Sequence, residues 1–138
     1  MKLCPYLNFN GNCQAAFRFY EEHLGGKISF MMTHAEAPAP QNVRPEWGSA
    51  ILHARMTIGD TDLMASDIPP EQQEPMRSCY LNLGVSNARE AERIFSVLEK
   101  GGQVIMPMQE TFWASRFGIL RDQFGVLWMV GADQPMQQ

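Results

Sequence analysis

Between residues 79 and 85 this 138-residue chain alternates between apolar side chains and polar or small ones. Leu81, Leu83 and Val85 fall on one side, while Asn82 and its neighbours at positions 80 and 84 fall on the other. This period of two is typical of a strand with one face on a core. The segment therefore predicts a half-buried strand whose other face carries polar side chains.

The next segment changes to a helical period. Asn87 has the residue type of a helix cap, and Glu90 stands three positions later, where it can return a hydrogen bond to the cap. Lys100 lies where the negative end of a helix dipole favours a cation, and Gly101 allows a left-handed exit. The spacing predicts a helix over Asn87–Lys100. Its apolar stripe consists of Ala91, Ile94, Phe95 and Leu98.

The same arrangement occurs earlier in the chain. Tyr6-Leu7-Asn8-Phe9 corresponds to Tyr80-Leu81-Asn82-Leu83, and each segment leads through an Asn-containing turn to a Gly-Gly pair. Such internal similarity predicts two copies of one supersecondary unit. We expect module 1 over about 1–67, a proline-rich linker over 68–77 and module 2 over about 78–132, within one domain.

The remaining elements follow from alternation and from turn residues. Residues 35–48 contain several prolines and no period, so we expect a loop there, and the tail from Asp133 is polar. Each copy then has the order βαβββ, an α+β fold. The expected strands are Leu3–Phe9, Lys27–Thr33, Ser49–Ile58, Asp62–Asp67, Cys79–Val85, Gln103–Met108, Phe117–Arg121 and Val126–Val130, with a first helix over Asn12–Leu24.

Composition excludes several classes of function. A net charge of −4 argues against sequence-independent binding of nucleic acid. No apolar run approaches the length of a membrane span, and the N-terminal residues lack the apolar core of a signal peptide, so we expect a cytoplasmic protein. Three cysteines without a CxxC pair favour free thiols over a disulfide or metal framework.

Several motifs point to a known family. They are Pro5-Tyr6-Leu7 with Gly11-Asn12-Cys13, Ile58-Gly59-Asp60 with Met64-Ala65-Ser66-Asp67, Gln109 to Ala114, and Asp122 to Met129. With two βαβββ modules, the chain resembles the PhnB-like branch of the vicinal oxygen chelate superfamily, which includes glyoxalase I, extradiol dioxygenases and bleomycin-resistance proteins. The resemblance implies a curved mixed sheet around a cleft, with the helices outside. Some members carry a demethylubiquinone methyltransferase label, but no Gly-rich nucleotide loop follows a strand here.

The resemblance also implies where a metal would bind. Metal enzymes of the superfamily hold a divalent ion with four ligands, typically His and Glu, one from each of four strands. The matching positions here are Pro5 or Tyr6, His53, Tyr80 and Met129. Proline has no donor, and neutral tyrosine and methionine suit hard cations poorly. We therefore expect no metal and no other cofactor.

Other residues are candidates for a ligand site. His53 and Arg55 share one strand face, where His53 is either a general base or a histidine bonded to the sheet's polar face. Glu110, Trp113 and Arg116 either surround a ligand or belong to an aromatic contact between subunits. The full set of expected ligand-binding residues is Tyr6, Asn8, His53, Arg55, Tyr80, Asn82, Trp113, Arg116 and Met129.

The sequence thus predicts a homodimeric, metal-independent protein that binds a small, partly aromatic molecule. The alternative is an enzyme of the same superfamily, a lyase, isomerase or dioxygenase, that uses a metal or has His53 or Glu110 as its base. A dimeric scaffold without a ligand is a third class.

Overall fold

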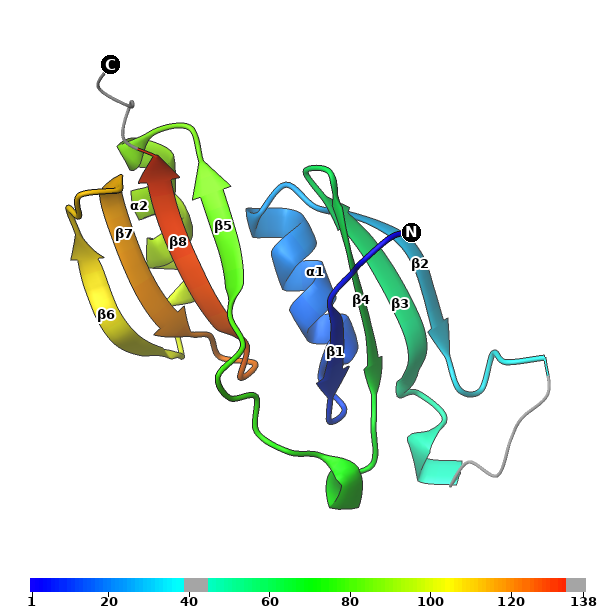
Figure 1. The fold of residues 1–138 in the computed structure, drawn as a ribbon. Coiled ribbons are helices and arrows are strands. Elements are labelled where there is room, and N and C mark those ends of the chain that lie inside the picture. Colours follow the sequence, from blue (N-terminus) through cyan, green and yellow to red (C-terminus); the bar gives the residue numbers. More distant parts are fainter. Residues whose placement is uncertain (39–44, 134–138) are drawn as a thin grey trace. The chain divides into compact units, whose positions relative to one another are not determined.

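The structure is a computed structural model that describes residues 1–38 and 45–133. Two modules of the order strand, helix and three strands follow one another (Figure 1), and the chain divides into compact units between Glu74 and Pro75. Two short 3-10 helices, η1 (Pro45–Trp47) and η2 (Pro70–Gln72), lie in the connections. The first module contains β1 (Tyr6–Phe9), α1 (Cys13–His23), β2 (Lys27–Thr33), β3 (Ile51–Ile58) and β4 (Thr61–Asp67). The second contains β5 (Leu81–Val85), α2 (Ala88–Leu98), β6 (Gln103–Gln109), β7 (Ala114–Arg121) and β8 (Leu127–Asp133).

Each module forms its own four-stranded mixed sheet. The strand order is β1-β4-β3-β2 in the first and β5-β8-β7-β6 in the second. The pairs β1–β4 and β5–β8 are parallel, and the remaining pairs are antiparallel. The predicted α+β fold with two βαβββ modules is therefore confirmed.

Helix α2 covers one face of the second sheet, as the figure shows within that module (Figure 1). The side-chain oxygen of Asn87 accepts the backbone N–H of Glu90 at 2.9 Å, which confirms the predicted cap. A Cβ atom added to Gly118 of β7 would lie 2.6 Å from the ring of Phe95, so only glycine lets the helix pack this closely. The predicted stripe is buried in full: Ala91, Ile94, Phe95 and Leu98.

Helix α1 packs on the first sheet in the same way but begins differently. Asn12 occupies the cap position, yet its side chain makes no cap hydrogen bond. The carboxylate of Asp67, at the end of β4, instead accepts the N–H groups of Gly11 at 2.8 Å and Cys13 at 3.0 Å. Its other oxygen accepts the N–H of Ile51 at 2.8 Å. A buried side chain 54 residues away in sequence from Cys13 thus anchors the helix start.

Several strands begin at residues other than the predicted ones. The first, third and fifth predicted strands begin later, at Tyr6, Ile51 and Leu81, and β7 begins earlier, at Ala114. Strand β6 runs through Pro107, which falls at a register shift on an edge strand, where a missing N–H is tolerated. Part of the predicted loop over 35–48 and the tail beyond Asp133 lie outside the described residues.

Two register shifts in the β2–β3 pair set which side chains face away from α1. One lies between Met32 and Thr33, opposite Leu52 of β3. Unbroken alternation along β3 predicts Leu52 on the helix side with Ala54, and Ile51 on the other side with His53, but Ile51 is buried and Leu52 is exposed. This expectation was wrong because the extra residue at the bulge reverses the alternation at the start of β3. Among the described residues, no helix is long and apolar enough to cross a membrane.

Candidate functional site

The face of the first sheet that points away from α1 carries polar and aromatic side chains. Directly paired residues of neighbouring strands point to the same side, and Tyr6, Met64, Arg55 and Phe30 are paired in that order across β1, β4, β3 and β2. The next row on the same face contains Asn8, paired with Ser66. We call this surface the open face of the first sheet.

His53 lies at the centre of an aromatic cluster on this face. Its ring is nearly parallel to that of Tyr6, with centroids 5.8 Å apart and an interplanar angle of 21°. The Tyr6 hydroxyl lies 3.2 Å from His53 Nδ1, within hydrogen-bond distance. Phe30 contacts the imidazole with a centroid separation of 5.8 Å. A pocket of about 440 Å³ opens here, lined by Ser29, Phe30, His53 and Arg55.

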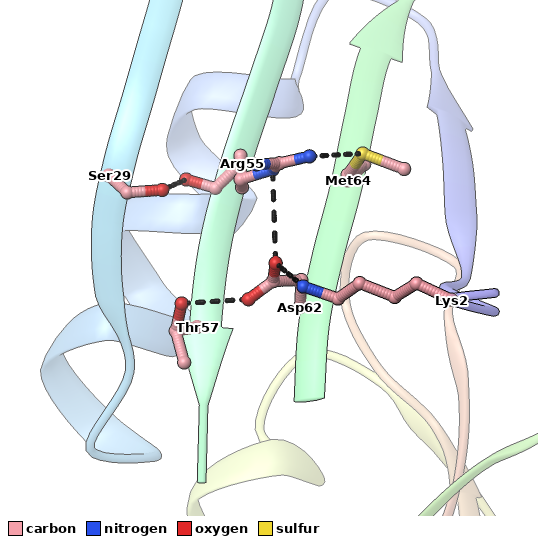
Figure 2. A network of polar contacts seen from close by, with 6 residues as sticks. All are labelled: Lys2, Ser29, Arg55, Thr57, Asp62 and Met64. Carbon is pink, nitrogen blue, oxygen red and sulfur yellow. Dashed lines mark hydrogen bonds and ion pairs between the residues drawn. The ribbon is translucent and has the colours of Figure 1, made fainter. Parts of the chain in front are cut away.

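A polar network borders the pocket (Figure 2). The carboxylate of Asp62 binds Lys2 Nζ and accepts the Thr57 hydroxyl at 2.9 Å, and it lies 3.9 Å from Arg55 Nε. The hydrogen bond from Lys2 and then that from Thr57 hold the pKa of Asp62 below its ordinary value, while desolvation acts in the opposite direction. Asp62 is therefore ionised at neutral pH, and Arg55 lies beside a carboxylate already bonded by other donors.

The second sheet presents an equivalent face to the side opposite α2. Asn82 is paired with Met129, and Met129 with Ile119, on the side away from buried Trp128 and Leu120. The predicted facing of Asn82 is confirmed within this module, and Met129 shares that face. Tyr80 precedes β5 and is 37% exposed.

An aromatic group lies at the start of β7, beside this second face. The Trp113 ring contacts Phe112 at 4.7 Å and Phe117 at 5.4 Å between centroids, both edge-to-face. Phe112 is 90% exposed and Trp113 is 51% exposed. Glu110 is also exposed, in the connection before β7. The roles assigned to Trp113 and Glu110 remain predictions.

A role of Arg116 in ligand binding requires its side chain on the face of the second sheet that points away from α2, but the side chain lies on the helix side. It pairs with Ala132 of β8, which is fully buried, and its Nε donates to Glu92 of α2 at 2.6 Å. This ion pair holds the guanidinium against the helix rather than on the open side of the sheet. We therefore leave Arg116 out of the site proposed below.

The residues at the positions of the superfamily's metal ligands supply few of the donor atoms that such a centre needs. Of the matching positions, His53 alone offers a good ligand atom, and its Nδ1 is already within bonding distance of the Tyr6 hydroxyl. Within residues 1–38 and 45–133, no three His, Cys, Asp or Glu side chains gather in a way that could hold a metal ion. These residues do not fit a His/Glu centre, and no reaction step is assigned to a metal.

Several residues at the pocket are not predicted by the sequence pattern. Phe30 and Ser29 of β2 line the pocket, and Asp62 and Lys2 form its polar border. Alternation does not predict Ser29 and Phe30 at the pocket because of the bulge in β2. Ile28 pairs with buried Met56, whereas Phe30, two residues later, pairs with Arg55 on the opposite face. No local pattern reveals the second pair, because Lys2 and Asp62 are 60 residues apart in sequence.

Comparisons with known proteins agree with this architecture. The profile of the Glyoxalase/Bleomycin resistance protein/Dioxygenase superfamily matches residues 5–130. The chain therefore belongs to this superfamily. It is 35% identical to Protein YjdN of Escherichia coli (strain K12) over an alignment 149 positions long, which covers 99% of this chain and 100% of that protein.

Two solved structures share the fold over nearly the whole chain. Protein PA1353 from Pseudomonas aeruginosa is 43% identical with a TM-score of 0.88, covering 98% of this chain and 99% of that one. The PhnB protein from Bacillus cereus, which carries the provisional label 3-demethylubiquinone-9 3-methyltransferase, is 20% identical with a TM-score of 0.81, covering 96% and 99%. The expected membership in the superfamily is thus confirmed, and the chain shares the fold of the PhnB protein.

Proposed function

We propose that this chain is a metal-independent protein that binds a small molecule on the open face of its first sheet. The observation that carries the proposal is the pocket of about 440 Å³ at Ser29, Phe30, His53 and Arg55. Its volume is in the range of small-molecule sites, and it combines aromatic walls with a few polar groups, as such sites do. Membership in a superfamily that includes bleomycin-resistance proteins supports a binding role.

The exposure of the aromatic walls supports the same proposal. Tyr6 is 46% exposed and Phe30 is 43% exposed, and both lie on the open face of the first sheet. Exposed aromatic side chains grouped around a hollow mark ligand or partner sites more often than single exposed apolar residues do. A ligand that covered Phe30 and His53 would remove this apolar surface from water.

A second candidate function is catalysis by His53. The supporting observation is the contact between the Tyr6 hydroxyl and His53 Nδ1 at 3.2 Å. In the tautomer whose Nδ1–H donates to the Tyr6 oxygen, Nε2 is unprotonated and can accept a proton, as a general base does. His53 would then take a proton from a ligand in the pocket. Glu110, in the second module, remains the alternative base expected from the sequence.

A ligand screen combined with metal analysis tests the proposal. Purified protein should contain no stoichiometric zinc, nickel, manganese or iron, and compounds that raise its melting temperature should shift NMR signals of Phe30 and His53. His53→Ala should abolish these ligand-dependent shifts. The control is His23→Ala, because His23 lies on α1 and contacts Phe19 rather than the pocket.

Two results would contradict the proposal in different ways. One equivalent of metal that His53→Ala removes would show that the protein is a metal protein. Ligand-dependent shifts that survive both His53→Ala and Phe30→Ala would place the binding site elsewhere. Turnover of a bound compound that is lost in His53→Ala and in Tyr6→Phe, with binding retained, would favour the catalytic alternative.

A further inference from the structure

We propose that the pocket on the first sheet selects a small aromatic carboxylate, whose carboxylate binds the Arg55 guanidinium and whose ring packs on Phe30 and His53. This inference rests on the proposed function and adds the chemical class of the ligand. Three features of the open face support it: the unused donors of Arg55, the charges around them and the aromatic walls.

The Arg55 guanidinium has few hydrogen-bond partners. Among the described residues, its side-chain donor bond goes from Nη2 to the Met64 sulfur at 3.7 Å, and thioether sulfur is a weak acceptor. Its closest carboxylate oxygen belongs to Asp62, 3.9 Å from Nε, which is beyond hydrogen-bond distance. A guanidinium has five N–H donors in a planar fork. Most of this fork therefore remains available to a ligand.

Asp62 positions Arg55 without satisfying it. Lys2 and Thr57 bind the Asp62 oxygens at closer range than Arg55 does (Figure 2). The carboxylate is thus fixed by other donors and attracts the guanidinium only from a distance. This arrangement holds Arg55 on the open face and leaves its guanidinium without a bidentate carboxylate partner. A ligand carboxylate can therefore form the bidentate pair.

The charges on this face favour an anion. Lys2 bonds to Asp62, and Lys27 is paired with Thr57 in the same row as Asp62. With Arg55, these lysines place more positive than negative charge around the carboxylate of Asp62. A cationic ligand would approach the guanidinium at the cost of repulsion, and a neutral one would leave its donors with water.

The aromatic side chains beside Arg55 favour an anion that carries a planar ring. Phe30 and Tyr6 flank the imidazole of His53, each with a centroid separation of 5.8 Å. Arg55 is paired with Phe30 across β3 and β2, so the anion-binding group and the aromatic surface are neighbours. A ring bearing a carboxylate contacts both at once, whereas an aliphatic acid of the same length gains less from the aromatic faces.

Calorimetric titration of the full chain with benzoate, benzamide and cyclohexanecarboxylate tests this inference. Benzoate should bind more tightly than either analogue. Arg55→Gln should weaken benzoate binding about tenfold, as expected for loss of a charge-assisted bidentate bond, and should leave benzamide within twofold. The matched control is Arg18→Gln, which removes the same charge from an exposed ion pair with Glu21 on α1. This control should leave benzoate binding within about twofold of the wild type.

Each outcome distinguishes the inference from the function on which it rests. Equal binding of benzoate and benzamide, or equal weakening by Arg55→Gln and Arg18→Gln, would overturn the carboxylate inference. Failure of benzoate to bind would do the same. The proposed function would survive these results if the broader screen finds neutral ligands that perturb Phe30 and His53. It would fail together with the inference if no compound does.

Discussion

Replacing Asp67 by alanine should destabilise the first module more than any surface substitution. Asp67 is only 4% exposed, and its carboxylate accepts three backbone N–H groups, those of Gly11, Cys13 and Ile51. These bonds join the start of α1, the start of β3 and the end of β4. Loss of the carboxylate would leave donors at Cys13 and Ile51 buried without an acceptor.

The expected cost follows from the number of bonds. A hydrogen bond to a charged group contributes about 1.5–3 kcal/mol, and a buried donor without an acceptor costs about 1–3 kcal/mol. Gly11 is exposed and can bind water, so two buried donors carry most of the loss. We expect Asp67→Ala to lower the free energy of unfolding by about 3–5 kcal/mol. Domains of this size have about 5–15 kcal/mol in total.

Asp67→Asn provides a graded comparison. The amide oxygen can keep the bonds to Gly11 and Cys13, but the amide nitrogen then faces the N–H of Ile51, donor against donor. We expect a loss of about 1–3 kcal/mol. Asp60→Asn, in the exposed turn after β3, is the control and should stay within about 0.5 kcal/mol of the wild type.

Urea unfolding followed by circular dichroism measures these differences, and amide hydrogen exchange at Cys13 and Ile51 reports the local opening. The reasoning is refuted if Asp67→Ala loses less than about 1 kcal/mol, or if Asp67→Ala and Asp67→Asn lose the same amount. It is also refuted if exchange at Cys13 and Ile51 keeps its wild-type protection in Asp67→Ala.

Two further predictions concern a buried thiol and the subunit contact. Burial, with the negative charge of Asp67 adding to it, raises the pKa of the Cys13 thiol from 9.0 to about 12. Because the folded pKa exceeds the unfolded one, the stability contributed by this thiol is complete below pH 9.0 and is lost as the pH rises toward about 12. Urea unfolding at pH values below and above 9.0 should show that the free energy of unfolding falls at alkaline pH, and that it falls less in Cys13→Ala. An equal fall in Cys13→Ala and in the wild type would contradict this. We also expect a homodimer that buries about 2,000 Å² or more, with exposed Trp113 at the boundary. Sedimentation should then show Trp113→Ala dissociating, whereas a wild-type monomer of 15.6 kDa would refute the dimer.

Local patterns were sufficient to predict the elements and the faces of α2 and β5. The stripe of α2 and the alternation of β5 are regular, so each buried position follows from its spacing. The Asn87 cap acts on a residue three positions away, which a local pattern can reveal. These features depend on short-range geometry alone.

The pocket depends on features that no local pattern carries. Bulges in the β2–β3 pair move Phe30 to the open face and reverse Ile51 and Leu52. The anchor of α1 at Asp67 links residues far apart in sequence, and Asn12, the local candidate, makes no cap bond. The prediction of strand faces from alternation assumes an unbroken ladder of hydrogen bonds between strands. The prediction of a helix cap assumes that the capping side chain is close in sequence to the helix start. Both assumptions fail in the first module.

The buried aspartates have a consequence for the history of the duplicated chain. Asp67 is paired with Phe9, and the corresponding pair in the second module is Leu83 with Val130. The second module buries its carboxylate elsewhere, at Asp122, which accepts the N–H of Val126 and the indole N–H of Trp128. A genetic crossover that joined the start of the first repeat to the end of the second would place the N–H groups of Gly11 and Cys13 opposite Val130, which has no side-chain acceptor. Selection against such recombinants would keep the halves distinct and allow each to diverge in its own chemistry.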